Sequence, residues 1–375
     1  MQAGSGDDIS LLGRPARYRG GLEDLGGGLW AWLQPNGGLG ESNAGLVVGD
    51  GESLLIDTLW DLRLTRRMLA AIAPHTVAAP IKRLVNTHAD GDHCWGNQLL
   101  AEADIISTEA AAVDMMREEP KRLRLFSRVG AGLETIKARD PLGRAVALLP
   151  ESVARRAGRI DFAPIPRAQE LAGVGAFARL LAAYDFEGIS LTPPTETFTG
   201  AMELEVGGRK VELIDVGPAH SPGDLIVHVP DERVIFAGDL VFVGVTPIMW
   251  VGPVENWIAG LDRIIELSPR VIVPGHGPTT GLDGARALRD YWEFIVPAVR
   301  KRVADGVDAH TAARDVVRSR EFSALPFAAW DAPERIAINS AIIARNDSGQ
   351  TGRVSDQARI RLLARMGELG AELEP

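Results

Sequence analysis

The sequence predicts an α/β protein with a layered architecture, and two observations support this prediction. Short apolar runs rich in β-branched residues alternate with stretches whose apolar residues recur at helical spacing. The ligand-type side chains come just past predicted strands, on turns rich in glycine or proline. With 375 residues, 46% of them hydrophobic, the chain has enough length for about two or three average domains, or for one catalytic core with an insertion and a tail.

The first part of the chain predicts a β-meander. Residues 1–28 are polar and glycine-rich, and we expect a weakly ordered lead-in. Three short strands separated by turns rich in Gly and Asn are expected next, at 29–33, 44–48 and 53–57. Asp57 ends the third strand. Its carboxylate either caps the following helix at 61–73, which we favour, or braces the polar loop after the next strand.

That polar loop, residues 86–93 with the sequence Asn-Thr-His-Ala-Asp-Gly-Asp-His, predicts a metal site. Imidazole nitrogens and carboxylate oxygens are common metal ligands, and a buried strand before the loop holds it still. The spacing lets His88 and Asp90 face one ion, and Asp92 and His93 face a second. The alternative is a solvated acidic turn that caps a helix. The ligand-type residues further along the chain make this the weaker interpretation.

From residue 112 to residue 199 the pattern changes to helical stretches rich in Arg and Lys, interrupted by prolines and without a strand signal. We predict a helical insertion in the core. Its apolar residues exceed what a solvated spacer needs. The insertion either forms a lid or pocket wall over the metal loop, or simply packs on the core or on a second subunit.

Three more ligand-type residues follow predicted strands. Two hairpins, 202–216 and 225–237, lead to His220 in Ala-His-Ser-Pro-Gly-Asp and to Asp239 in Ala-Gly-Asp. A helix and a strand then lead to His276 in Pro-Gly-His-Gly-Pro. Turns of this composition let the backbone approach an ion closely and fix the direction of the side chain.

Composition limits the partners and the compartment. The net charge of −10, without a basic stripe, argues against nucleic acid and anionic membrane surfaces. Nothing resembles an export signal, and no run approaches the about 18 to 20 apolar residues that span a bilayer. Cys94 is the only cysteine, so we expect a reducing, cytoplasmic setting and a buried filler role for this thiol. The helical tail, 283–375, either supports a homodimer or covers the core.

The motifs that carry ligand-type residues, taken in order, resemble the metallo-β-lactamase superfamily over residues 29–282. They are Asp57 after the third strand, the cluster at 88–93, His220 before Ser-Pro-Gly-Asp, Asp239 in Ala-Gly-Asp and His276 in Pro-Gly-His-Gly. The resemblance implies an αββα sandwich, two β-sheets face to face with helices outside, and a dinuclear metal site along one edge of the sheets. Position by position, it assigns the first metal to His88, the residue at 90 and His220, and the second metal to Asp92, His93 and His276. Asp239 falls where a carboxylate commonly bridges both ions.

The chain departs from the family at position 90, where the usual His-x-His-x-Asp-His pattern has histidine and this sequence has Asp90. An oxygen ligand shifts the metal preference toward iron or manganese without excluding zinc. Added negative charge also makes bound water less acidic. We expect two divalent ions, zinc first, with iron or manganese as the alternative. A third possibility is that Asp90 turns away and leaves the first site weak or empty.

The leading functional hypothesis is a metal-dependent hydrolase that acts on a small molecule. A metal-bound hydroxide would attack the carbonyl of an ester, lactone, thioester or amide, with Asp239 positioning the ions and Asp92 orienting the water. Trp95, the apolar segment 242–250 and the apolar residues of the insertion either line a pocket for an apolar or uncharged substrate or belong to the core. The sequence near the ligands contains no cluster of Arg or Lys that could bind a phosphate or sulfate group. This argues against phosphate and sulfate esters as substrates.

Two alternatives belong to other classes of protein. Asp90 is similar in kind to the carboxylate of di-iron or manganese redox members of the superfamily, although the tail lacks a glycine-rich flavin-binding loop after a strand. A non-catalytic metal-binding module is the other alternative. The almost complete ligand set disfavours it, because clustered carboxylates without a cation repel one another.

Overall fold

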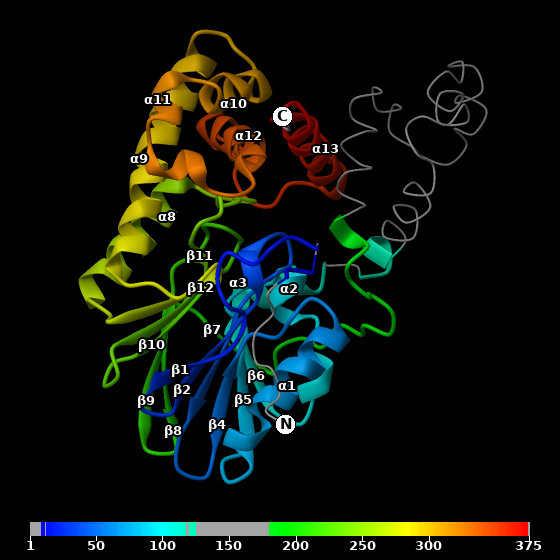
Figure 1. Cartoon of the computed structure of the whole chain (residues 1–375), viewed down its shortest axis with the longest axis vertical. Helices are drawn as coiled ribbons and strands as arrows, with labels where there is room; N and C mark the ends of the chain where they lie inside the picture. Colours follow the sequence, from blue (N-terminus) through cyan, green and yellow to red (C-terminus); the bar gives the residue numbers. More distant parts are fainter. Residues whose placement is uncertain (1–8, 12, 118–119, 125–179, 374–375) are drawn as a thin grey trace, which may run out of the picture.

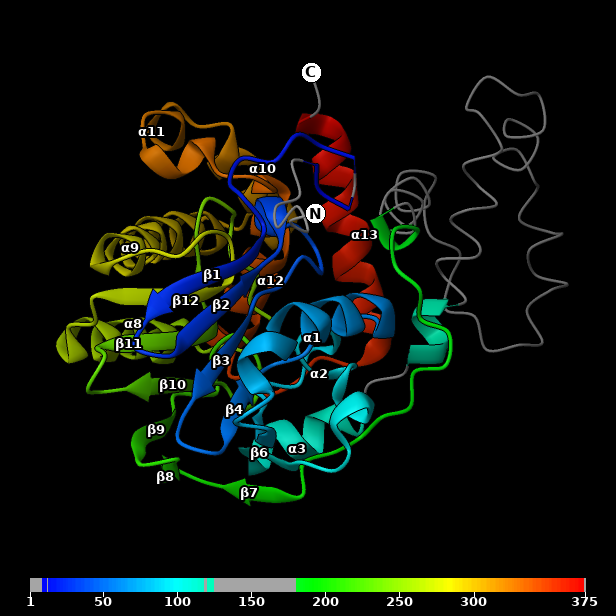
Figure 2. The ribbon, with the colours of Figure 1, turned by 60° about the horizontal axis from the view of Figure 1, so that its bottom comes forward.

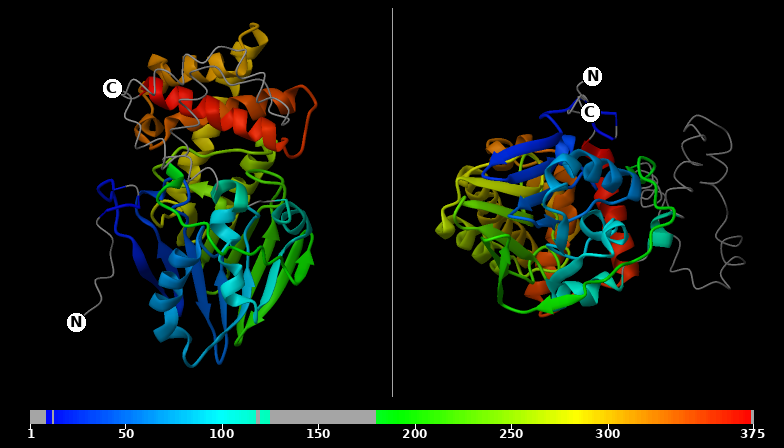
Figure 3. Two further views of the ribbon diagram at one scale, coloured as in Figure 1. Left: turned by 90° about the vertical axis from the view of Figure 1, so that its right-hand side faces the viewer. Right: turned by 90° about the horizontal axis from the view of Figure 1, so that it is seen from below.

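A computed structural model of the chain describes residues 9–11, 13–117, 120–124 and 180–373. Two β-sheets, one of seven strands and one of five, lie face to face, with helices outside them (Figure 1; Figure 3). The predicted αββα sandwich is therefore confirmed. Among the helices in these ranges, none combines the length and the apolar character that a membrane crossing requires.

The seven-stranded sheet comes from the first part of the chain. An antiparallel meander forms from β1 (Gly21–Gly26), β2 (Leu29–Leu33), β3 (Ala44–Val48) and β4 (Ser53–Ile56). Parallel pairing then adds β5 (Ile81–Val85), β6 (Asp104–Thr108) and β7 (Glu196–Phe198). Helix α1 (Leu62–Thr76) connects β4 to β5 and buries Leu64, Met68 and Ile72 on one face. Short helical turns also flank this sheet: η1 (Pro35–Gly37), α2 (Gly91–Cys94), η2 (Asn97–Leu100) and α3 (Glu109–Met115).

Two strands of this sheet differ from the prediction. β1 lies in the segment expected to be weakly ordered, and it forms because its backbone pairs with β2 from Gly21 to Gly26 while Leu25 is buried. β7 lies in the segment predicted to be strand-free, and its three residues are too few to show a periodic pattern. The central part of the predicted helical insertion, 125–179, lies outside the described residues.

The five-stranded sheet carries the second half of the ligand-type residues. Its strands are β8 (Ala201–Val206), β9 (Arg209–Asp215), β10 (Leu225–Val229), β11 (Val234–Phe242) and β12 (Val271–His276). Helix α8 (Val254–Leu267) connects β11 to β12, which run parallel. Between the two sheets Phe236 packs over Gly45, where any Cβ would come within 2.3 Å of the ring. Glycine at this position therefore lets the two sheets approach.

The C-terminal part covers one end of the sandwich (Figure 1). Its helices are α9 (Leu282–Ala304), α10 (Ala309–Val317), α11 (Arg320–Ser323), η3 (Pro326–Ala329), η4 (Pro333–Arg335), α12 (Ile336–Asp347) and α13 (Asp356–Leu373). One apolar cluster joins these helices to the sheet through Leu240, Trp257, Trp292 and Ile338. Of the two roles left open for the tail, covering the core is the one that the structure shows.

Candidate metal centre

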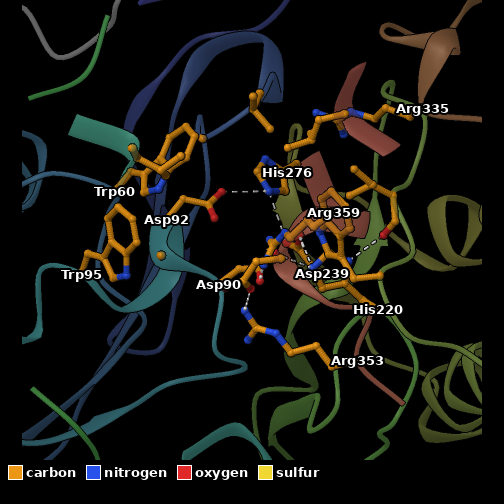
Figure 4. Close-up of a pocket in the computed structure, with 18 of the residues that line it drawn as sticks. Trp60, Asp90, Asp92, Trp95, His220, Asp239, His276, Arg335, Arg353 and Arg359 are labelled. Carbon is orange, nitrogen blue, oxygen red and sulfur yellow. Dashed lines mark hydrogen bonds and ion pairs between the residues drawn. The ribbon is translucent and has the colours of Figure 1, made fainter. Parts of the chain in front are cut away.

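The seven predicted ligand residues meet at one edge of the two sheets, and Figure 4 shows five of them around a pocket. Four are delivered by the loop and short helix after β5. The other three come from the turn after β9, from β11 and from the end of β12. Strand ends from both sheets therefore converge on one place, as their positions after predicted strands indicated.

The ligand-type atoms fall into two groups. His88, His220 and Asp239 form one group, and Asp92, His93 and His276 form the other. Within each group, one candidate ligand atom per residue lies within 4.8 Å of the others. Spacings of this kind let three side chains of a group reach one cation.

The Asp239 carboxylate lies between the two groups. Its Oδ2 is 3.4 Å from Nε2 of His220 and 3.9 Å from Nε2 of His88. Its Oδ1 is 3.1 Å from Nε2 of His93 and 3.4 Å from Nε2 of His276. One oxygen thus faces each group, which is the arrangement that a bridging carboxylate requires.

Asp90 belongs to neither group. Its Oδ2 lies 3.2 Å from Nε2 of His220, and its Oδ1 lies 3.5 Å from the guanidinium of Arg359 on α13. Burial alone would raise the pKa of Asp90, but Arg359 and His220 outweigh burial and hold this pKa well below its ordinary range. The carboxylate is therefore ionised and turned toward a cation that the protein itself supplies.

Second partners orient three of the imidazoles. The Thr87 hydroxyl donates to Asp57, so it accepts from Nδ1 of His88 at 2.9 Å. Nδ1 of His220 donates to the carbonyl of Ile248 at 2.6 Å. Nδ1 of His93 donates to Asp57 at 2.9 Å. In each ring these contacts fix Nδ1, so Nε2 faces the cluster and can coordinate a cation once it carries no proton.

The structure assigns Asp57 to the metal loop and not to the helix. Its carboxylate accepts from the backbone N–H and the hydroxyl of Thr87, both at 2.7 Å, in addition to Nδ1 of His93. The favoured capping role is wrong, because Asp61 caps α1 by accepting from the N–H of Leu64. Thr58, Leu59 and Trp60 separate Asp57 from that cap, and the end of β4 points Asp57 at the neighbouring end of β5.

Buried atoms in the cluster fit a cation. Nε2 of His88 is buried and has no hydrogen-bond partner among the described residues, and the buried Nε2 of His93 and Oδ1 of Asp239 make no well-oriented hydrogen bond although they lie 3.1 Å apart. Leaving such groups unsatisfied costs about 1–3 kcal/mol each. Coordination by a divalent ion would satisfy all of them, so the donor set suits metal binding. The same set of imidazoles and carboxylates suits zinc, iron or manganese.

A cavity of about 160 Å³ opens beside the two groups. Its apolar wall includes Trp60, Trp95, Phe242 and Trp250. Five arginines also line it: Arg117, Arg122, Arg335, Arg353 and Arg359. The sequence-based statement that no basic cluster lies near the ligands is therefore wrong. Three of these arginines come from residues 335–359, far along the chain from the metal loop, and no local spacing reveals that the fold brings them together. Figure 2 shows α13, the helix that carries Arg359, beside α2.

Two face-to-face sheets with two candidate groups of metal-ligand side chains at one edge define an αββα protein of the metallo-hydrolase type. A family model described as the metallo-beta-lactamase superfamily matches residues 37–276, and the chain belongs to this superfamily.

Named relatives are similar at low identity. The 2,4-dinitroanisole O-demethylase subunit alpha of Nocardioides sp. (strain JS1661) is 31% identical over 154 residues, which are 40% of this chain and 44% of that protein. The linear primary-alkylsulfatase of Pseudomonas sp. (strain ATCC 19151) is 25% identical over 256 residues, 64% of this chain and 43% of that protein. The chain thus spans less than half the length of either relative. The acyl-coenzyme A thioesterase MBLAC2 of Gallus gallus is 25% identical over 67% of this chain and 78% of that protein.

Solved structures share the fold. A metallo-beta-lactamase family protein of Thermus thermophilus superposes with a TM-score of 0.53 at 18% identity, over 88% of this chain and 97% of that chain. A double mutant of the sec-alkyl sulfatase PisA1 superposes with a TM-score of 0.59 at 16% identity, over 88% of this chain and 50% of that one.

Proposed function

We propose that the chain is a metal-dependent hydrolase that cleaves an ester, lactone, thioester or amide of a small molecule. The observation that supports this proposal is the pair of ligand groups that share Asp239 and open into a cavity with an aromatic wall. His88 and His220 would hold one ion, Asp92, His93 and His276 would hold the other, and Asp239 would bridge them. Two such ions would supply the charge that polarises the scissile carbonyl and a nucleophilic water near neutral pH.

Asp92 is the residue of the cluster best suited to handle a proton. It lines the cavity, and its Oδ2 lies 3.5 Å from Nε2 of His276. Burial raises the pKa of Asp92 above its ordinary value, although His93 and His276 act against this rise. A carboxylate with a raised pKa is a better proton acceptor. We assign to Asp92 the positioning of the attacking water and the acceptance of its proton.

The arginines of the pocket favour a second candidate, the hydrolysis of an alkyl sulfate ester. A sulfate ester is anionic at its reacting group, and guanidinium groups recognise such oxyanions by charge-assisted hydrogen bonds. One relative is named an alkylsulfatase, at 25% identity.

Purified protein, its metal content and a substrate panel test the proposal. We expect about two equivalents of a divalent metal, and turnover of at least one member of a panel of lactones, thioesters, carboxylic esters, amides and alkyl sulfates. Asp239→Asn and His276→Ala should abolish this turnover, and His75→Gln, which changes a histidine remote from the cluster, should not. Full activity of Asp239→Asn would refute the assigned site. Two equivalents of iron with a charge-transfer absorption would favour the redox alternative.

A further inference from the structure

Arg335 is a buried cation at the wall of the pocket without an acidic partner. It ends η4, and only 4% of its surface is exposed. No Asp or Glu of the described residues forms an ion pair with its guanidinium, whose one side-chain hydrogen bond goes from Nη1 to the carbonyl of Thr246 at 3.0 Å. We propose that Arg335 binds an anionic group of the substrate, a carboxylate or a sulfate, beside the second ligand group.

The position of Arg335 relative to the metal cluster supports this role. Its Cζ lies 5.9 Å from the centre of the Phe242 ring. That ring stacks on His276 with 5.1 Å between the ring centres and 6° between their planes. Figure 4 shows Arg335 in the wall of the pocket that also holds His276. The charges of Asp239 and Asp92 also act on Arg335, so an anion on Arg335 would lie in the same pocket as the second group.

The electrostatics of Arg335 favour a bound anion. Burial lowers the pKa of Arg335 more than the nearby carboxylates of Glu334, Asp239 and Asp92 raise it, yet a guanidinium stays protonated in proteins. Its charge is therefore buried with no described carboxylate in direct contact with it. Such a charge is costly in a protein interior. An anion that reaches it from the cavity would offset this cost and form charge-assisted hydrogen bonds. Most of the N–H donors of the side chain are available for these bonds.

The other arginines of the pocket differ from Arg335. Arg353 pairs with Asp114, Arg122 pairs with Asp356, and Arg359 pairs with Asp90. Arg117 is exposed to solvent, which hydrates its charge. Among the arginines described at the pocket, Arg335 alone combines deep burial with the lack of an acidic partner.

This inference rests on the proposed hydrolase function and narrows its substrate class. The anionic group would meet Arg335, and the apolar part would lie along Trp60 and Trp95, which Figure 4 shows on the opposite side of the pocket. The substrate is therefore an amphipathic small molecule, and not the uncharged one that the sequence alone favoured. Arg335 lies beyond residues 37–276, so the family match does not assign it.

Calorimetric titration of the metal-loaded protein tests the proposal without needing turnover. The probes are hexanesulfonate, heptanoate and the uncharged hexanamide. We expect the protein to bind at least one of the two anions at least about tenfold more tightly than hexanamide. Arg335→Met should remove this preference, while hexanamide binding, metal content and circular dichroism stay the same. Arg263→Met changes an exposed arginine on α8 and should leave the preference intact.

The binding measurements either support or overturn the role of Arg335. Equal binding of anions and amide by the unaltered protein would overturn the proposal, and so would a preference that survives Arg335→Met. Arg335→Lys keeps the charge with fewer donors and should retain part of the preference; it replaces the methionine variant if that variant does not fold. A lost preference supports the assignment whichever anion binds more tightly. Failure of the hydrolase proposal would instead appear as no turnover of the substrate panel by a protein that still selects anions through Arg335.

Discussion

The guanidinium of Arg359 and the carboxylate of Asp90 face each other at 3.5 Å across the pocket. Arg359 also lies over the indole of Trp250, with its Cζ 4.3 Å from the ring centre. This contact ties α13 to Asp90, the position of the metal loop where the sequence resemblance leads us to expect histidine. The negative charge of Asp90 is thus balanced by a residue of the C-terminal helix.

We predict that Asp90→His strengthens zinc binding by the first ligand group. An imidazole at position 90 restores the usual pattern of the family and replaces a carboxylate that is held by Arg359. Zinc stoichiometry and affinity, measured by competition with a chromophoric chelator, provide the test. Unchanged values for the variant would show that position 90 does not contribute to a metal site.

We predict that Arg359→Met raises the affinity of the first ligand group for a divalent cation by about tenfold. The change removes a positive charge beside that group and releases Asp90 to turn toward it. Arg361→Met is the matched control, because residue 361 is an exposed arginine on the same helix. Equal cation affinities for the two variants would contradict the role assigned to the Arg359 charge.

Asp57→Ala should weaken metal binding by about 10- to 100-fold, since it removes the partner that orients His93 and the backbone of the metal loop. Asp61→Ala is the comparison. It should lower the free energy of unfolding by about 1 kcal/mol through the loss of the α1 cap and leave metal affinity unchanged. Metal titration and chemical denaturation of both variants separate the two effects. Unchanged metal affinity of the Asp57 variant would contradict the role of Asp57 in orienting the metal loop.

Metal binding should release protons. Burial alone would lower the pKa of His220, but the carboxylates of Asp239 and Asp90 outweigh burial and raise it to about 9. For His93, burial is likewise outweighed by Asp239 and Asp92, and its pKa lies well above the ordinary value. Both rings therefore hold protons near pH 7 without metal and must lose them to coordinate. Metal affinity should fall as the pH drops below 9.

Calorimetry in two buffers of different ionisation enthalpy measures this proton release at pH 7. We expect the apparent binding enthalpy to change with the buffer, in proportion to the protons released. Identical enthalpies in both buffers would show that the metal-free rings are already neutral.

Much of the fold was predictable because buried strands and amphipathic helices leave a periodic trace in the sequence. The strand at 81–85 was predicted with the boundaries that the structure has, since it begins just after Pro80 and its apolar end, Leu84 and Val85, runs into a polar loop. β1 was not predicted, because its stability comes from backbone pairing with β2, and Gly21, Glu23 and Asp24 are poor strand formers.

The residues of the candidate metal centre could be named from the sequence because each stands in a distinctive short motif at or near a predicted strand end, although Asp239 lies within β11 and His276 is the last residue of β12. The arginines that line the pocket could not be predicted from the sequence. Arg335 and Arg359 follow no motif, and they reach the pocket only because the C-terminal helices pack over the end of the sheets. The role of Asp57 was also missed, since the hydrogen bonds that define it cross from β4 to the loop after β5.

The paired ligand groups lie within residues 88–276, whereas three of the five arginines of the pocket, Arg335, Arg353 and Arg359, come from residues 335–359. Changes in the C-terminal helices can therefore alter which molecules enter the pocket without touching a single metal-coordinating atom. This separation provides a modular route by which one hydrolytic centre can be adapted to new substrates, and it makes the C-terminal helices the natural segment to exchange in an engineered chimaera.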